Sequence, residues 1–180
     1  MSMQTLEESI RRIVKSNPVV YAQQSMDTIK RYLLDSNPMN LWKDNGPIHA
    51  TASCYAFDIK YEKILLVFHK KGHFWVQPGG HLERVDATIE DAVLRELREE
   101  TGLSAVTDAV FNYDIDVHTL SSGFGRCTAH IDFGVSIVMD DKKPLTLSDE
   151  SQQLGWFKID SLPSPLASNV TRRIAALMPA

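Results

Sequence analysis

The sequence has little of what marks several large classes of protein. Its 180 residues include two cysteines, Cys54 and Cys127, and no Cys-x-x-Cys pair, so it has neither a disulfide framework nor that zinc-binding motif. The longest apolar runs, such as residues 64–68, are far shorter than the roughly 20 residues that cross a bilayer. The first 15 residues carry acids and arginines without a continuous apolar stretch, and no signal peptide is visible. We therefore expect a cytoplasmic protein with two partly buried free thiols.

A surplus of positive charge is also absent. There are 19 Lys and Arg against 23 Asp and Glu, which gives a formal net charge of −4. Binding to long duplexes requires a basic surface, so duplex nucleic acid is not expected as a partner. The short apolar runs predict that a membrane is not a partner either. Hydrophobic residues make up 43% and charged residues 23%, close to the average of globular domains, which excludes disorder, collagen-like repeats and coiled-coil rods.

Residues 1–47 differ in pattern from the rest of the chain. Apolar side chains recur at helical spacing from residue 6 to residue 14, and Asn17-Pro18 ends that stretch. A second helical pattern covers residues 23–34. We predict a helical N-terminal extension of residues 1–47 that packs on the main domain, residues 48–180, or on a partner, a homodimer being one such arrangement.

From residue 48 the pattern changes to strands. The predicted strands are 50–59, 63–69, 74–76, 105–117, 128–138 and 154–159, and the predicted helices are 88–100 and 169–178. For the first of these helices, Thr88 is expected to cap the N-terminus and Gly102 to end it. Strands interrupted by one central helix and followed by a final helix indicate an α/β fold with helices packed on a mixed sheet.

The predicted helix 88–100 carries a cluster of acids. Glu96, Glu99 and Glu100 are three and four residues apart, so their carboxylates share one face of the helix. Their repulsion destabilises an isolated helix by about a few tenths of a kcal/mol per pair, and the negative end of the helix dipole adds to this. A helix that tolerates both costs usually has a compensating cation, and clustered carboxylate oxygens are preferred ligands of Mg²⁺ and Mn²⁺.

The surroundings of this acidic face point to a phosphorylated substrate. The opposite face of the helix is an apolar stripe that would anchor it to a sheet. Gly79 and Gly80 precede the helix, and glycine lets the backbone approach another group closely. A rigid acidic face beside a glycine-rich loop suits metal-assisted attack on a phosphoanhydride, because metals screen phosphates and lower the pKa of bound water.

The spacing in this region resembles the signature of the Nudix hydrolases, MutT-like enzymes. Residues 95–103 read Arg-Glu-Leu-Arg-Glu-Glu-Thr-Gly-Leu and match the second half of that signature throughout. The first half departs from it, since eight residues instead of seven separate Asp86 from Arg95. Asp86 still suits the family role of a carboxylate that pairs with Arg95. The resemblance covers about residues 48–178 and is nearest to a bacterial branch with no assigned substrate.

The resemblance implies a Nudix α/β/α sandwich with a mixed sheet. It also implies a divalent-metal-dependent pyrophosphohydrolase that acts on a nucleoside diphosphate linked to another moiety. Glu99 and Glu100 then correspond to the main ligands of Mg²⁺ or Mn²⁺. Glu96 corresponds to a third ligand or to the residue that orients the metal-bound water, and the backbone carbonyl of Gly80 to a further ligand.

The resemblance leaves other roles open. The general base in relatives is either a helix glutamate, here Glu99 or Glu96, or an acid from a later loop, and Glu150 matches one such loop position. An exposed turn acid is the alternative interpretation of Glu150. Arg95 corresponds to a residue that pairs with nearby acids and would also face the substrate. His81 follows the glycine pair, where it would contact a phosphate or pack in the loop.

Further polar residues alternate along two predicted strands, Asp114, Asp116 and His118 on one and His130 and Asp132 on the other. If these strands are neighbours, the five side chains would form one polar patch beside the acidic helix. Alternation of this kind is common on solvated sheet faces, and we favour that interpretation over substrate binding.

Two other functions share the same fold. A Nudix-fold module that binds or senses a nucleotide without turnover is one, although such a module need not keep the glutamates. A diphosphate isomerase of the isoprenoid type is the other, and it would need a reactive cysteine. Neither Cys54 nor Cys127 has an acid paired with it in the sequence pattern.

Overall fold

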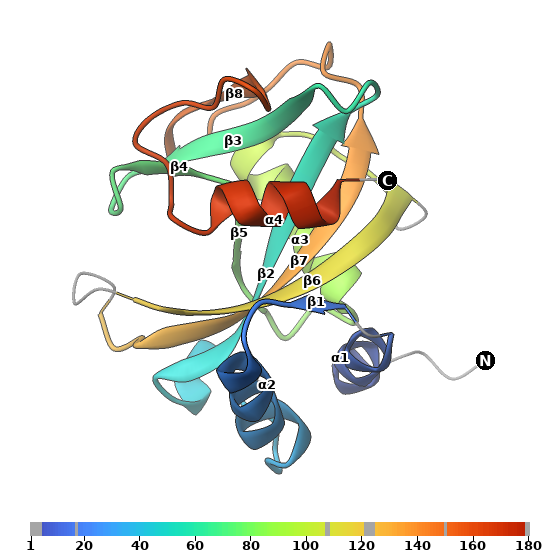
Figure 1. The fold of residues 1–180 in the computed structure, drawn as a ribbon, viewed down its shortest axis with the longest axis vertical. Coiled ribbons are helices and arrows are strands. Elements are labelled where there is room, and N and C mark those ends of the chain that lie inside the picture. The colour runs from blue at the N-terminus through green and yellow to red at the C-terminus, as the bar shows by residue number, and fades with distance from the viewer. Residues whose placement is uncertain (1–4, 17, 107–108, 121–124, 150, 179–180) are drawn as a thin grey trace.

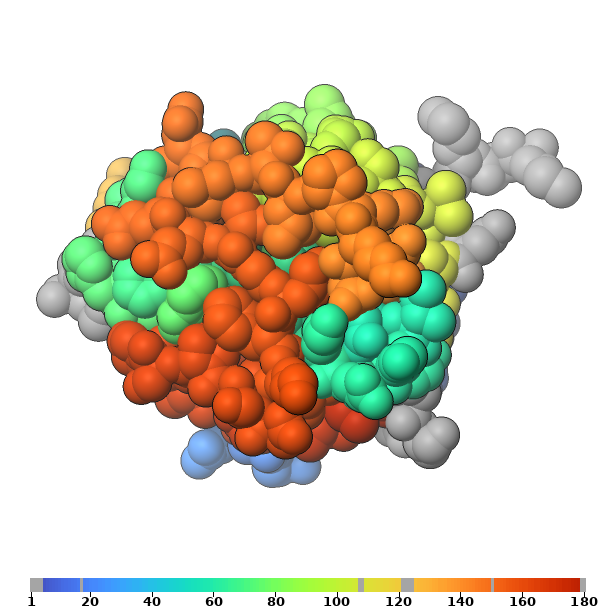
Figure 2. Space-filling model, turned by 90° about the horizontal axis from the view of Figure 1, so that it is seen from above, coloured from blue at the N-terminus to red at the C-terminus, as the bar shows by residue number. Residues whose placement is uncertain are grey.

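The computed structural model describes residues 5–16, 18–106, 109–120, 125–149 and 151–178. Figure 1 shows one sheet-centred body, with the C-terminal helix in front of the sheet and the N-terminal helices below it. Figure 2 shows the molecule from above. The chain that follows residue 139 and leads to the C-terminal helix, in orange, covers much of this face. Among the described residues, no helix is both long and apolar enough to cross a membrane.

The sheet has eight strands. They are β1 (Val19–Val20), β2 (Ile48–Asp58), β3 (Lys63–His69), β4 (Phe74–Val76), β5 (Gly79–His81), β6 (Val110–Thr119), β7 (Ala129–Met139) and β8 (Ser151–Lys158). Their order is β1-β6-β7-β2-β3-β4, while β5 pairs with β2 and β8 with β3. Strands β2 and β7 run parallel over their whole length and β6 runs antiparallel to β7, so the sheet is mixed, as predicted.

Two helices cover opposite faces of this sheet (Figure 1): α3 (Ile89–Thr101) lies behind it and α4 (Val170–Leu177) in front. Successive side chains of a strand point to opposite faces, and β2 shows the consequence. Ala52 packs in the core that contains α3, whereas Tyr55 packs in the core that contains α4. Whether a side chain of β2 faces α3 or α4 therefore depends on its place in this alternation along the strand.

The ends of α3 are fixed by local chemistry. The Thr88 hydroxyl accepts a hydrogen bond from the backbone N–H of Asp91 at 3.1 Å, which confirms the predicted N-cap. Gly102 has a φ of 75°, the left-handed conformation that glycine adopts without strain, and its N–H donates to the Arg98 carbonyl. The acidic face thus belongs to a helix with a defined start and end.

The N-terminal segment forms α1 (Leu6–Lys15), α2 (Gln23–Ile29), a π-helical segment (Lys30–Leu34) and a short 3₁₀ turn (Lys43–Asn45). Its apolar side chains join the core that contains α3, and Ile10 and Ile13 are fully buried. The Ser9 hydroxyl accepts from the backbone N–H of Ile89 at 3.2 Å and donates to the Glu90 carboxylate at 3.2 Å. The segment therefore packs on the main domain, one of the two expected arrangements, and contacts the first turn of α3.

The fold differs from the sequence prediction at several places. Strand β6 begins at Val110, later than the predicted start at residue 105, and residues 107–108 of that prediction lie outside the described residues. Strand β8 begins at Ser151, three residues earlier than predicted, and the helical pattern of residues 23–34 changes from α to π geometry at Lys30. Strands β1 and β5 were not predicted, since β1 has two residues and β5 consists of two glycines and a histidine. Neither carries a strand pattern of its own, and each is ordered by pairing, β1 with β6 and β5 with β2.

Candidate functional site

A pocket of about 260 Å³ lies where the acidic face of α3 meets β5. Its lining residues come from β5 and the loop after it, from α3 and from the loop before β8: Gly80, His81, Glu83, Arg95, Glu96, Glu99, Glu100 and Ser148. The structure thus brings five of the seven predicted site residues, Gly80, Arg95, Glu96, Glu99 and Glu100, together in this pocket. His81 also lines it, and its backbone carbonyl accepts a hydrogen bond from Arg95. Glu150, predicted as an alternative general base, lies outside the described residues.

The three glutamates of the predicted cluster differ in exposure. The Glu99 side chain is 51% exposed and the Glu96 side chain 12%, while Glu100 is buried. One carboxylate oxygen of Glu100 accepts the backbone N–H of Gly79 at 3.1 Å, which fixes β5 against the end of α3. The cluster therefore spans from the protein interior to solvent, with Glu99 the most accessible of the three.

Gly80 lies directly against the Glu96 carboxylate. A Cβ atom at this position would come within 2.7 Å of Glu96 Oε1, so only glycine permits this approach. The backbone of β5 and three carboxylates from one helix face thus meet at one place. Carboxylate and carbonyl oxygens are the donor set that Mg²⁺ and Mn²⁺ prefer, so the residues present fit a hard divalent cation.

Arg95 connects the members of this cluster. Its Nη1 donates to Glu96 at 2.8 Å and to Glu99 at 3.0 Å. Its Nη2 donates to the His81 carbonyl at 2.9 Å, and the guanidinium forms two further bonds with Asp86. A guanidinium has five N–H donors, and all five are used here. The hydrogen bond to Asp86 is the main cause that raises the pKa of Arg95 above its usual value, so it stays charged.

Asp86 connects the loop before α3 to Arg95. Asp86 pairs with Arg95, as predicted, and its side chain is 2% exposed. It also accepts the backbone N–H of Glu83 at 2.7 Å, which closes the loop before α3. Asp86 therefore holds both the loop before α3 and the Arg95 side chain of that helix.

The alternating acids of β6 and β7 form a different group. The two strands are neighbours, as anticipated, with Asp116 opposite Asp132. The patch lies under α4 on the other face of the sheet, not beside α3, and Asp114, Asp116 and Asp132 are buried. The expectation of a solvated face was wrong, because the fully buried Arg173 of α4 forms ion pairs with Asp114 and Asp132.

Nothing in single-strand patterning predicted that Arg173 would be buried among these acids. An arginine in the last helix is normally assigned to the surface, since charged residues are almost never fully buried unless paired. The available signal was the combination of alternating acids on two strands with an Arg-Arg pair in an amphipathic helix. The network of Arg173 with these acids fixes α4 to the sheet, and none of its residues lines the pocket.

Comparison with known proteins shows which family shares this fold and sequence. The NUDIX domain family model matches residues 47–178. The chain belongs to the Nudix family. Its fold resembles the NUDIX domain of Shewanella oneidensis NrtR complexed with ADP ribose, with a TM-score of 0.56 and 19% identity over 71% of this chain and 84% of that one.

Two other Nudix structures show the same likeness. The MutT NUDIX hydrolase from Burkholderia pseudomallei gives a TM-score of 0.52 at 22% identity, covering 72% of this chain and 99% of that one. The C. elegans Ap4A hydrolase gives 0.50 at 17% identity, covering 62% and 80%. No curated protein matches this chain. At these identities the structures confirm the predicted Nudix α/β fold, and the chemistry has to be argued from the site.

Proposed function

We propose that this Nudix protein is a divalent-metal-dependent pyrophosphohydrolase. Its substrate would be a nucleoside diphosphate linked to another moiety. The observation that supports this is the convergence of Glu96, Glu99 and Glu100 with the Gly80 backbone on one pocket. Nudix relatives are consistent with this substrate class, since one was determined with ADP ribose and another is named as an Ap4A hydrolase.

The carboxylates of Glu96, Glu99 and Glu100 and the Gly80 carbonyl would hold Mg²⁺ or Mn²⁺. When bound, such a cation screens the phosphates and lowers the pKa of a water molecule that attacks phosphorus. Glu99 is the most exposed of the three glutamates, so it is the candidate general base that a water molecule in the pocket can reach most directly. Glu96 and Glu150 stay alternative candidates for the general base.

Arg95 would act on the reaction through the glutamates. Its five donors are engaged with protein acceptors, so it holds Glu96 and Glu99 at fixed positions on the pocket wall. Such preorganisation lowers the cost of arranging charged groups around the reacting phosphate. A direct contact of Arg95 or His81 with substrate stays a prediction, as do the division at residue 47 and the homodimer.

The test is hydrolysis of nucleotide sugars, dinucleotides and nucleoside triphosphates with and without Mg²⁺. The proposal predicts turnover that requires the metal and that Glu99→Gln and Glu100→Gln both abolish. Glu62→Gln, an exposed acid outside the pocket, is the matched control and should keep full turnover. Full metal-dependent activity in both pocket variants would show that the site is assigned wrongly.

A nucleotide-binding module without turnover is the second candidate. It is favoured by the engagement of both Glu96 and Glu99 with Arg95 and by the extra residue after Asp86. Calorimetric binding of ADP ribose with no product in the presence of Mn²⁺ would establish it. Isomerase chemistry is not favoured, because Cys54 is fully buried and burial, together with the nearby Glu100, raises the pKa of its thiol.

A further inference from the structure

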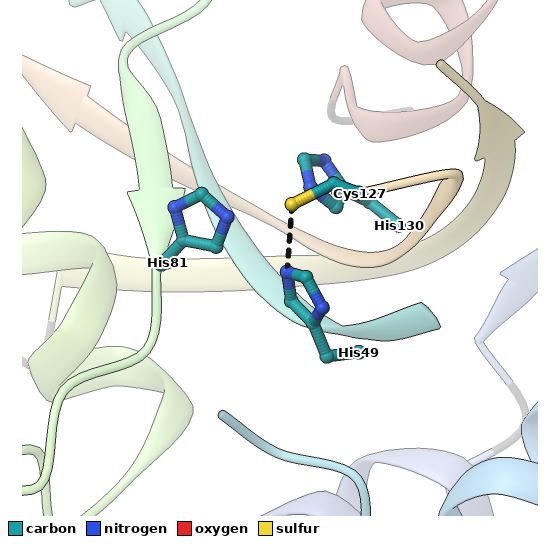
Figure 3. Close-up of side chains that lie close together, drawn as sticks. All are labelled: His49, His81, Cys127 and His130. Carbon is teal, nitrogen blue, oxygen red and sulfur yellow. Dashed lines mark hydrogen bonds between the residues drawn. The ribbon is translucent and has the colours of Figure 1, made fainter. Parts of the chain in front are cut away.

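Three histidines and one cysteine meet on the face of the sheet opposite the acidic cluster. They are His49 from the start of β2, His81 from the end of β5, and Cys127 and His130 around the start of β7 (Figure 3). One nitrogen or sulfur atom of each lies within 4.8 Å of those of the other three. None of the sequence motifs predicts this group, because its members come from segments far apart in the chain.

Strand pairing explains why they meet. His49 and His130 are direct partners across β2 and β7, so they lie on the same face. His81 is the partner of Thr51, which shares a face with His49 because it is two residues further along β2. Gly80, one residue earlier, faces Glu96 on the other side. Two successive residues of β5 thus face opposite sides of the sheet: Gly80 faces the acidic pocket, and the His81 side chain faces the histidine cluster.

The ring orientation of His49 is fixed by a backbone contact. Its Nδ1 lies 2.9 Å from the Gly46 carbonyl and must therefore carry the proton that it donates. The other nitrogen, Nε2, then presents a lone pair at 3.9 Å from the Cys127 sulfur. A carbonyl that accepts from the outer nitrogen is the usual support of a metal-binding histidine.

Two further nitrogens of the cluster residues are buried without a partner. The Nε2 atoms of His81 and His130 are buried, and neither has a hydrogen bond to any described residue. A buried polar atom without a partner costs about 1–3 kcal/mol. Two such atoms beside a thiol and a third oriented imidazole indicate that the cluster is arranged for a ligand that accepts their lone pairs.

We propose that His49, His81, Cys127 and His130 bind a zinc ion, separate from the divalent cation of the acidic pocket. Three imidazoles and a thiolate are a donor set that Zn²⁺ prefers in tetrahedral geometry, and oxygen-seeking Mg²⁺ does not. Bonds of about 2.0–2.1 Å to nitrogen and about 2.3 Å to sulfur place neighbouring ligand atoms roughly 3.3–3.6 Å apart. The four side chains then need to move together by about 1 Å at most.

Four protein ligands make this a structural site, since a catalytic zinc keeps a position open for water or substrate. The ion would connect the starts of β2 and β7 with β5. His81 is adjacent to Gly80, and its carbonyl accepts a hydrogen bond from Arg95. The zinc would therefore fix the strand that carries the Gly80 carbonyl, and the His81 ring would serve the zinc rather than a substrate phosphate.

Untagged protein provides the test, because a polyhistidine tag binds metals itself. Metal analysis should find about one zinc per chain, and X-ray absorption at the zinc edge should show one sulfur and three nitrogen ligands. Replacement by Co²⁺ should give the thiolate-to-cobalt absorption band. If the protein binds no zinc after reconstitution, or if the zinc has only oxygen and nitrogen ligands, the proposal is wrong. This test uses the wild-type protein, so it does not depend on the folding of any variant.

Variants then assign the ligands. Cys127→Ser and His130→Ala should weaken zinc binding by more than the roughly 10–100-fold that loss of a supporting residue causes, and Cys127→Ser should abolish the cobalt band. Cys54→Ala, in the other cysteine, and His118→Ala, whose ring centroid is 5.6 Å from that of His130, are the controls and should keep both. A cobalt band that persists in Cys127→Ser or disappears in Cys54→Ala would refute the assignment.

The two metal sites are separable in the same experiments. Glu99→Gln should lose Mg²⁺-dependent turnover and keep its zinc, because Glu99 belongs to the acidic pocket alone. A protein that binds zinc through Cys127 but hydrolyses no nucleotide would uphold the zinc site and count against the proposed hydrolase. A protein that hydrolyses nucleotides with Mg²⁺ but binds no zinc would uphold the hydrolase and count against the zinc site.

Discussion

Arg95 and Asp86 form two parallel hydrogen bonds, Nε to Oδ1 at 3.0 Å and Nη2 to Oδ2 at 2.9 Å. Both side chains are nearly excluded from solvent. A bidentate pair of this kind fixes the guanidinium plane as well as its position. Because the same guanidinium also holds Glu96 and Glu99, the geometry of the pocket depends on a residue of the preceding loop.

Removal of Arg95 should therefore destabilise the fold. In Arg95→Ala the Asp86 carboxylate stays buried without its partner, and breaking a buried pair costs about 3–5 kcal/mol. Urea unfolding gives the free energy directly. Arg98→Ala, an exposed arginine on the same helix, should change it by less than about 0.5 kcal/mol, and equal losses in the two variants would contradict this account.

Substitution of Gly80 should affect turnover more than stability. The added methyl group of Gly80→Ala would displace the Glu96 carboxylate, which lies at the end of a flexible side chain. Misplacing a catalytic group by about 1 Å can cost roughly 100-fold in rate, so we expect a loss of that order in kcat with the melting temperature little changed. Gly155→Ala is the control, since its Cβ would make only an ordinary contact at 3.6 Å. Undiminished turnover in Gly80→Ala would argue against the role of Glu96.

The first helix should be required for the stability of the Nudix domain. Ile13 is fully buried in the core shared with α3, and truncating a buried isoleucine to alanine costs about 2–5 kcal/mol. Ile13→Ala should show that loss in urea unfolding. The exposed neighbour Arg11→Ala should stay within about 0.5 kcal/mol of the wild type. Unchanged stability in Ile13→Ala would mean that α1 is dispensable.

Asp116 should contribute stability that is lost in acid. Burial opposes its ionisation, but hydrogen bonds from His118 and Asn169 and the charge of Arg173 outweigh burial and lower its pKa from 3.8 to about 2. Since the folded pKa is the lower one, the stabilisation is complete above about pH 4 and disappears as the pH falls toward 2. Its size is about 2 kcal/mol.

The measurement is urea unfolding of wild type and Asp116→Asn in steps from pH 6 to pH 3. The stability advantage of the wild type should be constant at the upper end and shrink at the lower end. Asp160→Asn, at an exposed position, should show no comparable difference at any pH. An advantage for the wild type that grows toward low pH would reverse the sign and exclude the explanation.

The sequence allowed the acidic pocket to be predicted because its parts are close in the chain. Glu96, Glu99 and Glu100 are within two turns of one helix, and helical periodicity alone puts them on one face. Gly80 and Asp86 lie in the short strand and the loop that precede that helix. The caps at Thr88 and Gly102 are local too, and both were confirmed.

The histidine cluster and the buried Arg173 network could not be predicted in this way. Each depends on register between strands separated by long stretches of sequence, such as the pairing of His49 with His130. A shift of register by one residue would turn every side chain of a strand to the other face. Alternating polar residues show that a strand has a polar face, but not which helix covers it, and the interpretation of that face as solvated failed for this reason.

The burial of Arg173 also sets an order of events during synthesis. Asp132 precedes Arg173 by 41 residues and Asp114 precedes it by 59, so both acids leave the ribosome well before their cation. Burying either carboxylate without a partner is costly, and the growing chain cannot complete this side of its sheet until the last helix has emerged. Nascent chains that stall before α4 should therefore be held open, as substrates for chaperones and proteases.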